Sequence, residues 1–194
     1  MELKPIFVHT ETGEGLYAIQ YPGQESDEFE RLFDLWSDTE LVHNYCVLNE
    51  PYLSTEYFTG VSIDMIEEKI MNEAAELEVL LEEHCNQGLE NNGLTLQMIF
   101  RPLDNNEHLL PIRQETKVKI HDTRNFPRPI LRVYGIRLGD NTFVITGGSV
   151  KLTKYMKDHP DTNIELEKLK VVKAFLKEND IDTDEDLNYF YEQS

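Results

Sequence analysis

Residues 130–146 read ILRVYGIRLGDNTFVIT and give the clearest indication of the fold. Apolar and β-branched residues recur through 130–138 and 142–146, and Gly139-Asp140-Asn141 lies between the two runs. Such residues favour strands, and a short link of Gly, Asp and Asn is typical of a tight turn. The stretch therefore predicts two adjacent antiparallel strands joined as a hairpin.

Further runs with the alternation of a strand precede this hairpin. Residues 94–100 and 117–121 each show a period of two, and a loop with two prolines, 123–129, separates the second run from the hairpin. Near the N-terminus, residues 5–8 and 15–21 predict another hairpin, which ends at a Pro-Gly pair. The chain therefore offers enough strands for a small sheet.

Two segments of the N-terminal half have the periodicity of amphipathic helices. Residues 26–36 predict a helix capped by Ser26, and residues 62–87 predict a longer helix that ends at Gly88. The segment 41–60 has no clear periodicity and receives no assignment. The polar side of the long helix is acidic, and we expect these glutamates to face solvent: Glu67, Glu68, Glu73, Glu76, Glu78, Glu82 and Glu83.

Two more helices are expected near the C-terminus. Residues 183–191 predict a short acidic helix that opens with a capping box formed by Thr183 and Asp186. Residues 161–179 predict the longer one, and its apolar residues form the expected buried face: Ile164, Leu166, Leu169, Val172, Phe175 and Leu176.

The order of these elements indicates an α+β fold, in which a small antiparallel sheet is packed by N-terminal helices and a C-terminal helix. We expect an N-terminal elaboration over residues 1–60, an α+β core over 61–179 and an acidic tail over 180–194. The three parts are expected to form one compact domain, because 194 residues suffice for a hydrophobic core of useful size.

The composition points to the interior of a cell. Two cysteines imply no disulfide framework and favour a reducing compartment. No apolar run approaches the roughly 18 residues of a membrane helix, and the first residues lack the pattern of a signal peptide. We therefore expect a cytoplasmic protein without a membrane partner.

The charge is distributed very unevenly. The net charge is −19, yet residues 113–177 hold fourteen of the 18 basic residues and only seven of the 37 acidic ones. An acidic protein as a whole repels nucleic acid, but a basic stretch can still form a local anion-binding face. The alternative interpretation is an uneven surface without a binding role.

Several cations of this basic stretch lie at positions that a sheet can bring together. Lys117 and Lys119 are two residues apart and so point to one face, as do Arg132 and Tyr134 on the next strand. If the two strands pair, all four converge, and Lys151 with Lys154 follows the last strand. Fixed cations on a concave face can hold a phosphodiester and stabilise the charge of a phosphorane. Each lysine considered alone is equally consistent with a solvated sheet surface.

The order of these motifs resembles that of the RelE/HigB-type toxins of the RelE/ParE superfamily. The resemblance covers about residues 94–179 and rests on four segments: Lys117-Val118-Lys119-Ile120-His121, Leu131-Arg132-Val133-Tyr134, Phe143-Val144-Ile145-Thr146-Gly147-Gly148 and Lys151-Leu152-Thr153-Lys154-Tyr155, followed by Pro160 and the helix with Ile164-Glu165. It implies a RelE-like fold.

The resemblance also implies an activity, that of a metal-independent and cofactor-free endoribonuclease that cleaves mRNA. Attack by the 2′-hydroxyl needs only acid, base and charge stabilisation. The implied partners are mRNA, the ribosome and an antitoxin protein. By this resemblance the catalytic residues are Lys117, Lys119, Arg132, Lys151 and Tyr155. The basic stretch around them supplies the candidate RNA-binding residues Arg113, Arg124, Arg128, Tyr134 and Lys154.

Within that set, one strand lysine is expected near the 2′-hydroxyl and the other on the phosphate, which Arg132 grips. Tyr155 would stack on a base or transfer a proton. His121 and His159 are further acid/base candidates. Three functions remain open. The first is RNA cleavage or binding at the basic face, and the second is a non-catalytic protein–protein interaction module on the same fold whose acidic body docks a basic partner. The third is a phage or mobile-element accessory protein without an enzymatic role.

Overall fold

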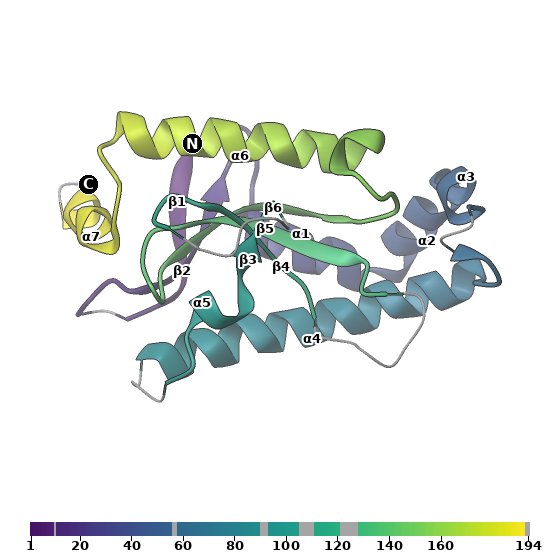
Figure 1. The fold of residues 1–194 in the computed structure, drawn as a ribbon, viewed down its shortest axis with the longest axis horizontal. Helices are drawn as coiled ribbons and strands as arrows, with labels where there is room; N and C mark the ends of the chain where they lie inside the picture. Colours follow the sequence, from purple (N-terminus) through teal and green to yellow (C-terminus); the bar gives the residue numbers. More distant parts are fainter. Residues whose placement is uncertain (10, 56–57, 90–92, 105–110, 121–127, 193–194) are drawn as a thin grey trace.

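The computed structural model describes residues 1–9, 11–55, 58–89, 93–104, 111–120 and 128–192 (Figure 1). It contains these elements in chain order: β1 (Glu2–Val8), β2 (Gly15–Gln20), α1 (Glu28–Ser37), α2 (Thr39–Leu48), α3 (Glu50–Leu53), α4 (Ile63–Leu89), α5 (Leu96–Ile99), β3 (Arg101–Pro102), β4 (Glu115–Val118), β5 (Leu131–Arg137), β6 (Phe143–Val150), a 3₁₀ turn (Met156–Asp158), α6 (Pro160–Glu178) and α7 (Asp184–Glu192).

The described strands form one six-stranded sheet in the order β1-β2-β6-β5-β4-β3. Both predicted hairpins, β1–β2 and β5–β6, are antiparallel, as is the β4–β5 pair. The prediction of a wholly antiparallel sheet is wrong, because β2 and β6 pair in parallel with Leu16 opposite Phe143. The fold is α+β with a mixed sheet. Five helices, α1 to α5, lie between β2 and the later described strands, and no local turn motif signals such a distant pairing.

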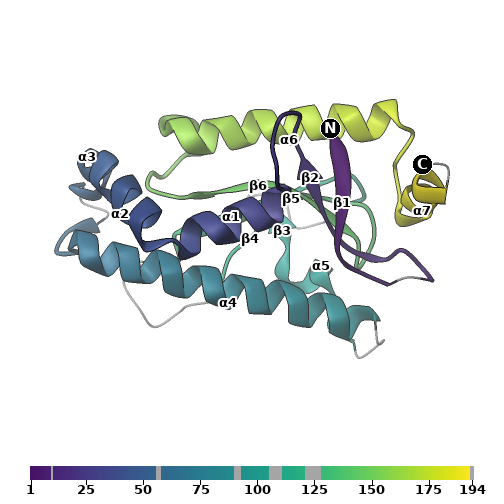
Figure 2. The same cartoon turned by 180° about the vertical axis from the view of Figure 1, so that it is seen from behind.

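Helices cover both faces of this sheet, so the protein has three layers (Figures 1 and 2). On one face, α1 and α4 pack against a core that includes Trp36, Ile70, Leu77 and Val133. On the other face, α6 and α7 pack against Tyr134, Ile136 and Val144, which belong to a second core. Among the described residues, no helix combines the length and apolar character needed to cross a bilayer.

The predicted strand over residues 94–100 is wrong. Residues Leu96–Ile99 form the short helix α5, and only Arg101–Pro102 pair with β4 as strand β3. Leu96 and Phe100 are both fully buried, whereas Met98 is half exposed. One helical turn brings residues four apart to the same side, so the helix buries both large side chains at the cost of exposing Met98.

The ends of several helices differ from the prediction in detail. The cap of α1 is Asp27, not Ser26, and its Oδ1 accepts hydrogen bonds from the Phe29 and Glu30 amides at 2.8 and 3.1 Å. Asp38 caps α2 in the same way, and α2 extends into the segment 41–60, which had no assignment. Gly88 lies inside α4, which ends one residue later.

The capping box of α7 is confirmed. The Thr183 amide donates to Asp186 Oδ2 at 2.9 Å, and the Asp186 amide donates to Thr183 Oγ1 at 3.3 Å. Two buried glutamates, by contrast, contradict the expected helix faces. Glu73 on α4 is only 2% exposed, and on α6 Glu165 is buried while the neighbouring Ile164 is 54% exposed.

Candidate functional site: a basic cleft on the sheet

The register of the sheet brings Lys117, Arg132 and Tyr134 to one face. Lys117 of β4 lies opposite Tyr134 of β5, which in turn lies opposite Gly147 of β6. Arg132, two residues before Tyr134, lies opposite Ser149. Directly opposed residues of antiparallel strands project to the same side, so these side chains share the face on which α6 lies. This is the arrangement that the alternation predicted.

A cleft of about 470 Å³ opens on this face. All five residues predicted as catalytic line it, and so do two of the residues predicted to bind RNA. The lining consists of Leu103, Asp104, Lys117, Lys119, Arg132, Tyr134, Lys151, Lys154, Tyr155 and Met156. Five cations and one acid therefore surround the opening, on a protein whose net charge is strongly negative.

The three other residues predicted to bind RNA do not line the cleft. Arg113 forms an ion pair with Asp182, in the turn that leads into α7, and its amide donates to Arg137 O at the far end of β5. Arg128 is exposed and acts on the cleft only through its charge, which helps to lower the pKa of Lys119. Arg124, like His121, lies outside the described residues.

Burial, together with neighbouring positive charges, makes Lys117 the cation of the cleft whose pKa is shifted most. Burial, followed by the positive charges of Arg132, Lys151 and Lys119, lowers the pKa of Lys117 to about 8. Its Nζ donates to Leu103 O at 2.7 Å, which fixes the ammonium over the sheet. About a tenth of a group with such a pKa is neutral at pH 7. Lys117 can therefore take up a proton at neutral pH, which an ordinary lysine cannot.

Arg132 is the electrostatic centre of the cleft. Burial and the Arg132 charge are the two largest causes that lower the pKa values of Lys119 and Lys151. Its side chain is buried, and Nη1 donates to the backbone oxygens of Pro129 at 2.9 Å and Leu131 at 2.6 Å. These contacts hold the guanidinium in place. A fixed guanidinium is well suited to a phosphate oxygen.

The two tyrosines of the cleft differ in exposure. Tyr134 is buried, its hydroxyl lies 3.3 Å from Ser149 Oγ, and burial raises its pKa to about 12, so it stays protonated. Tyr155 is 54% exposed, and Lys154 Nζ lies 5.1 Å from the centre of its ring. An exposed aromatic ring beside a cation can stack on a nucleobase.

Residues Leu103 and Asp104 were missed by the sequence interpretation. They follow β3, a two-residue strand, and enter the cleft because β3 pairs with β4 beside Lys117. Asp104 is the acid that opposes the lowering of the Lys117 pKa. A two-residue strand carries too little periodicity to be recognised, and the mistaken strand over 94–100 occupied its place.

His159 is not an acid/base residue of the cleft. It caps α6, since its Nδ1 accepts from the Asp161 amide at 3.3 Å, and its Nε2 lies 3.0 Å from Asn49 Oδ1. Burial lowers its pKa. The Tyr52 ring packs edge-on against the His159 ring, with the two ring centres 4.4 Å apart. These contacts give His159 a structural role. Within the described ranges, no three His, Cys, Asp or Glu side chains gather as metal ligands.

Comparison with known proteins gives no relative for this arrangement. No family model, no curated protein and no solved structure matches the chain.

Proposed function

We propose that the protein binds RNA in the basic cleft and cleaves it there as a metal-independent endoribonuclease of the RelE/HigB type. The observation that carries the proposal is the convergence of five cations from three separate segments on one cleft. Burial and the mutual repulsion of the cations make such a group unfavourable by itself, and both lower the pKa values of three of its lysines. A polyanion relieves that repulsion, and a phosphodiester also fits the planar Arg132 group.

In the proposed mechanism, Lys117 accepts the proton of the 2′-hydroxyl. The oxygen then attacks the adjacent phosphorus and forms a cyclic phosphate, while the bond from phosphorus to the 5′-oxygen breaks. Arg132 and Lys151 stabilise the added negative charge of the phosphorane. The leaving 5′-oxygen takes a proton from Lys154 or Tyr155 at the mouth of the cleft, and Lys119 holds a neighbouring phosphate.

A substitution of Lys117 tests this mechanism. Lys117→Met keeps most of the stem and removes the amine, so we expect cleavage of an mRNA substrate, free or on the ribosome, to fall by about 10²–10⁴-fold. The products of the unaltered protein should end in a 2′,3′-cyclic phosphate. Lys170→Met is the matched control, because Lys170 is exposed on α6 and pairs with Glu167 at 2.7 Å. An unaltered protein that binds RNA and leaves it intact would restrict the function to binding.

A second candidate is the interaction module without catalysis. The exposed face of α4 favours it, because acids there alternate with exposed apolar residues. The acids are Asp64, Glu68, Glu76, Glu78, Glu82 and Glu83, and Met65 and Val79 are each about half exposed. A basic partner, such as an antitoxin, would be retained by this face. If RNA neither binds nor is cleaved and reversal of the α4 charges abolishes binding of such a partner, this candidate is the correct one.

A further inference from the structure

A second cavity, of about 340 Å³, lies between α1, α2 and α6 above strand β6. Its volume is at the lower end of the range of small-ligand pockets, roughly 300–1,000 Å³. Trp36, Val42 and Ile70 are among the apolar residues that line it, and all three belong to the core between the sheet and α4. The cavity is independent of the basic cleft, with which it shares no lining residue.

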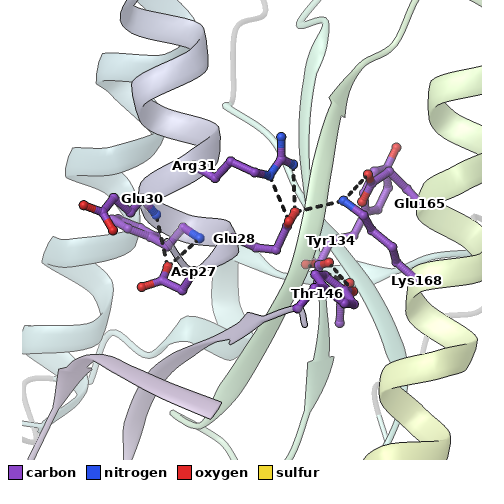
Figure 3. Close-up of polar contacts among 10 residues, drawn as sticks. Asp27, Glu28, Glu30, Arg31, Tyr134, Thr146, Glu165 and Lys168 are labelled. Carbon is purple, nitrogen blue, oxygen red and sulfur yellow. Dashed lines mark hydrogen bonds and ion pairs between the residues drawn. The ribbon is translucent and has the colours of Figure 1, made fainter. Parts of the chain in front are cut away.

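The cations at the edge of this cavity are already engaged by carboxylates (Figure 3). Arg31 donates to both oxygens of the fully buried Glu28 at 2.8 Å. Lys168 Nζ lies 2.9 Å from Glu28 Oε2 and 2.9 Å from Glu165 Oε1. The site is therefore not preorganised for an anion, since its positive groups are already paired.

Three buried oxygens of side chains that line this cavity have no hydrogen-bond partner among the described residues. They are the acceptors Glu165 Oε2 and Gln24 Oε1 and the hydroxyl oxygen of Tyr45, which can both donate and accept. Glu165 is only 4% exposed, and in Figure 3 its second oxygen points away from Lys168. Its carboxylate occupies the space that Gly147 leaves open, because a Cβ there would collide with Oε2. Buried acceptors without donors are costly, so donors from outside the chain are favoured here.

The balance of charge indicates what kind of donor fits. When Glu165 is ionised, the buried acids Glu28 and Glu165 balance the bases Arg31 and Lys168. Asp161, which lines the cavity with a side chain that is 43% exposed, adds one negative charge to this group. One monovalent cation neutralises the group, and an apolar body fits the lining of the cavity.

We propose that this cavity binds a small organic cation, an ammonium or guanidinium group on a short apolar chain, whose N–H groups donate to Glu165 and Gln24. A lysine side chain of another protein and a free alkylamine share this chemistry.

The protonation of Glu165 provides a readout that a purely structural role lacks. Burial raises its pKa to about 7, against the Lys168 charge. A bound cation favours the ionised carboxylate, so affinity should rise as the pH increases from 6 to 8. The other ionisable groups around Glu165 are Glu28 and Arg31 on α1, Tyr21 after β2 and Tyr134 on β5, and neither tyrosine titrates in this range.

The experiment uses Trp36, the one tryptophan of the chain, which lines the cavity. We expect pentylammonium chloride to change its fluorescence saturably, and more tightly at pH 8 than at pH 6. 1-Pentanol and sodium pentanoate, at matched ionic strength, should give no saturation in the same range. N-acetyl-lysine amide identifies the source, because its binding supports a protein side chain and its failure, with pentylammonium still bound, supports a free amine.

Two variants test whether the side chains of Glu165 and Gln24 bind the cation. Glu165→Gln should weaken pentylammonium binding at least tenfold at pH 8, and Gln24→Met should weaken it severalfold while the rest of the cavity is retained. Glu167→Gln, an exposed position on the same helix, should leave affinity unchanged. The proposal is overturned if pentylammonium causes no saturable change in fluorescence, which would mean that only water fills the site. It is also overturned if pentanol binds equally well, or if folded Glu165→Gln and Gln24→Met both bind pentylammonium like the unaltered protein.

Discussion

At the scale of single residues, Lys117 connects the geometry of the cleft to a measurable pH dependence. A general base acts in its neutral form, and burial among cations lowers the Lys117 pKa to about 8. Below that value the neutral fraction rises about tenfold per pH unit, and above it the fraction levels off. Single-turnover cleavage should follow this curve between pH 6 and 9. The residual rate of Lys117→Met should lack the step near pH 8, and an identical step in the variant would assign it to another group.

The raised pKa of Glu165 leads us to expect that the stability of the fold depends on pH. Its folded pKa is about 7 and its reference value 4.5, so between these values the folded protein holds a proton that the unfolded chain releases. Stability that is fully present below pH 4.5 is therefore lost as the pH rises through 7. Glu165→Gln removes this loss. Its unfolding free energy relative to the unaltered protein should increase from pH 5 to pH 8, by at most roughly 3 kcal/mol.

Urea denaturation of both proteins at the two pH values measures this difference. The comparison cancels the general effect of the acidic surface, because both proteins share it. A difference that stays constant from pH 5 to pH 8 would mean that Glu165 is ionised throughout that range.

At the scale of elements, α4 fixes the start of β5 through a buried acid. The two Glu73 oxygens accept hydrogen bonds from the Ile130 amide at 3.1 and 2.8 Å and from the Leu131 amide at 2.8 Å, and Lys69 pairs with the carboxylate at 3.0 Å. Glu73→Ala leaves these amides without an acceptor, so we expect a loss of roughly 2–4 kcal/mol in unfolding free energy. Glu76→Ala, at an exposed position of the same helix, should cost less than about 0.5 kcal/mol. Equal effects would contradict the role of Glu73.

Most elements of the fold could be predicted from the sequence, but the buried glutamates could not. The hairpins, the long helices and the pairing of β4 with β5 follow from local periodicity and turn residues, and the structure contains them. Glu73 and Glu165 were assigned wrongly or overlooked, because their burial depends on partners far along the chain or on space left by Gly147. Local patterns carry no information about such contacts.

The candidate cleft was predictable to the extent that it depends on alternation. Lys117, Arg132 and Tyr134 share a face because strand side chains alternate, and the turn after β6 brings Lys151 and Tyr155 beside them. Arg113 was grouped with them only because it is basic and near in sequence. Its ion pair with Asp182 holds it near the C-terminal end of β5. The cleft lies toward the other end of this seven-residue strand.

At the scale of the whole molecule, the layers separate the acids from the cleft. Helix α4, with its exposed acids, covers one face of the sheet, whereas Arg132 and Tyr134 belong to the face on which α6 lies (Figure 1). Screening in physiological salt limits the range of the field of an exposed charge to about 8 Å. Acids on the far side of the sheet therefore weaken the positive field of the cleft only slightly. A net charge of −19 is thus compatible with binding of a polyanion at one site.

The central claim is that the cations of the cleft hold a phosphodiester chain. Its most direct test is the affinity for a 2′-O-methyl oligoribonucleotide, which cannot be cleaved, measured by fluorescence anisotropy over a series of salt concentrations. For Lys119→Ala/Lys151→Ala we expect affinity to fall at least tenfold and the salt slope to decrease by about 1.4, or 0.7 for each lost phosphate contact. Lys170→Ala/Lys177→Ala, with the same change in net charge on the outer face of α6, should bind like the unaltered protein; equal losses in the two double variants, or no binding by the unaltered protein, would contradict the claim.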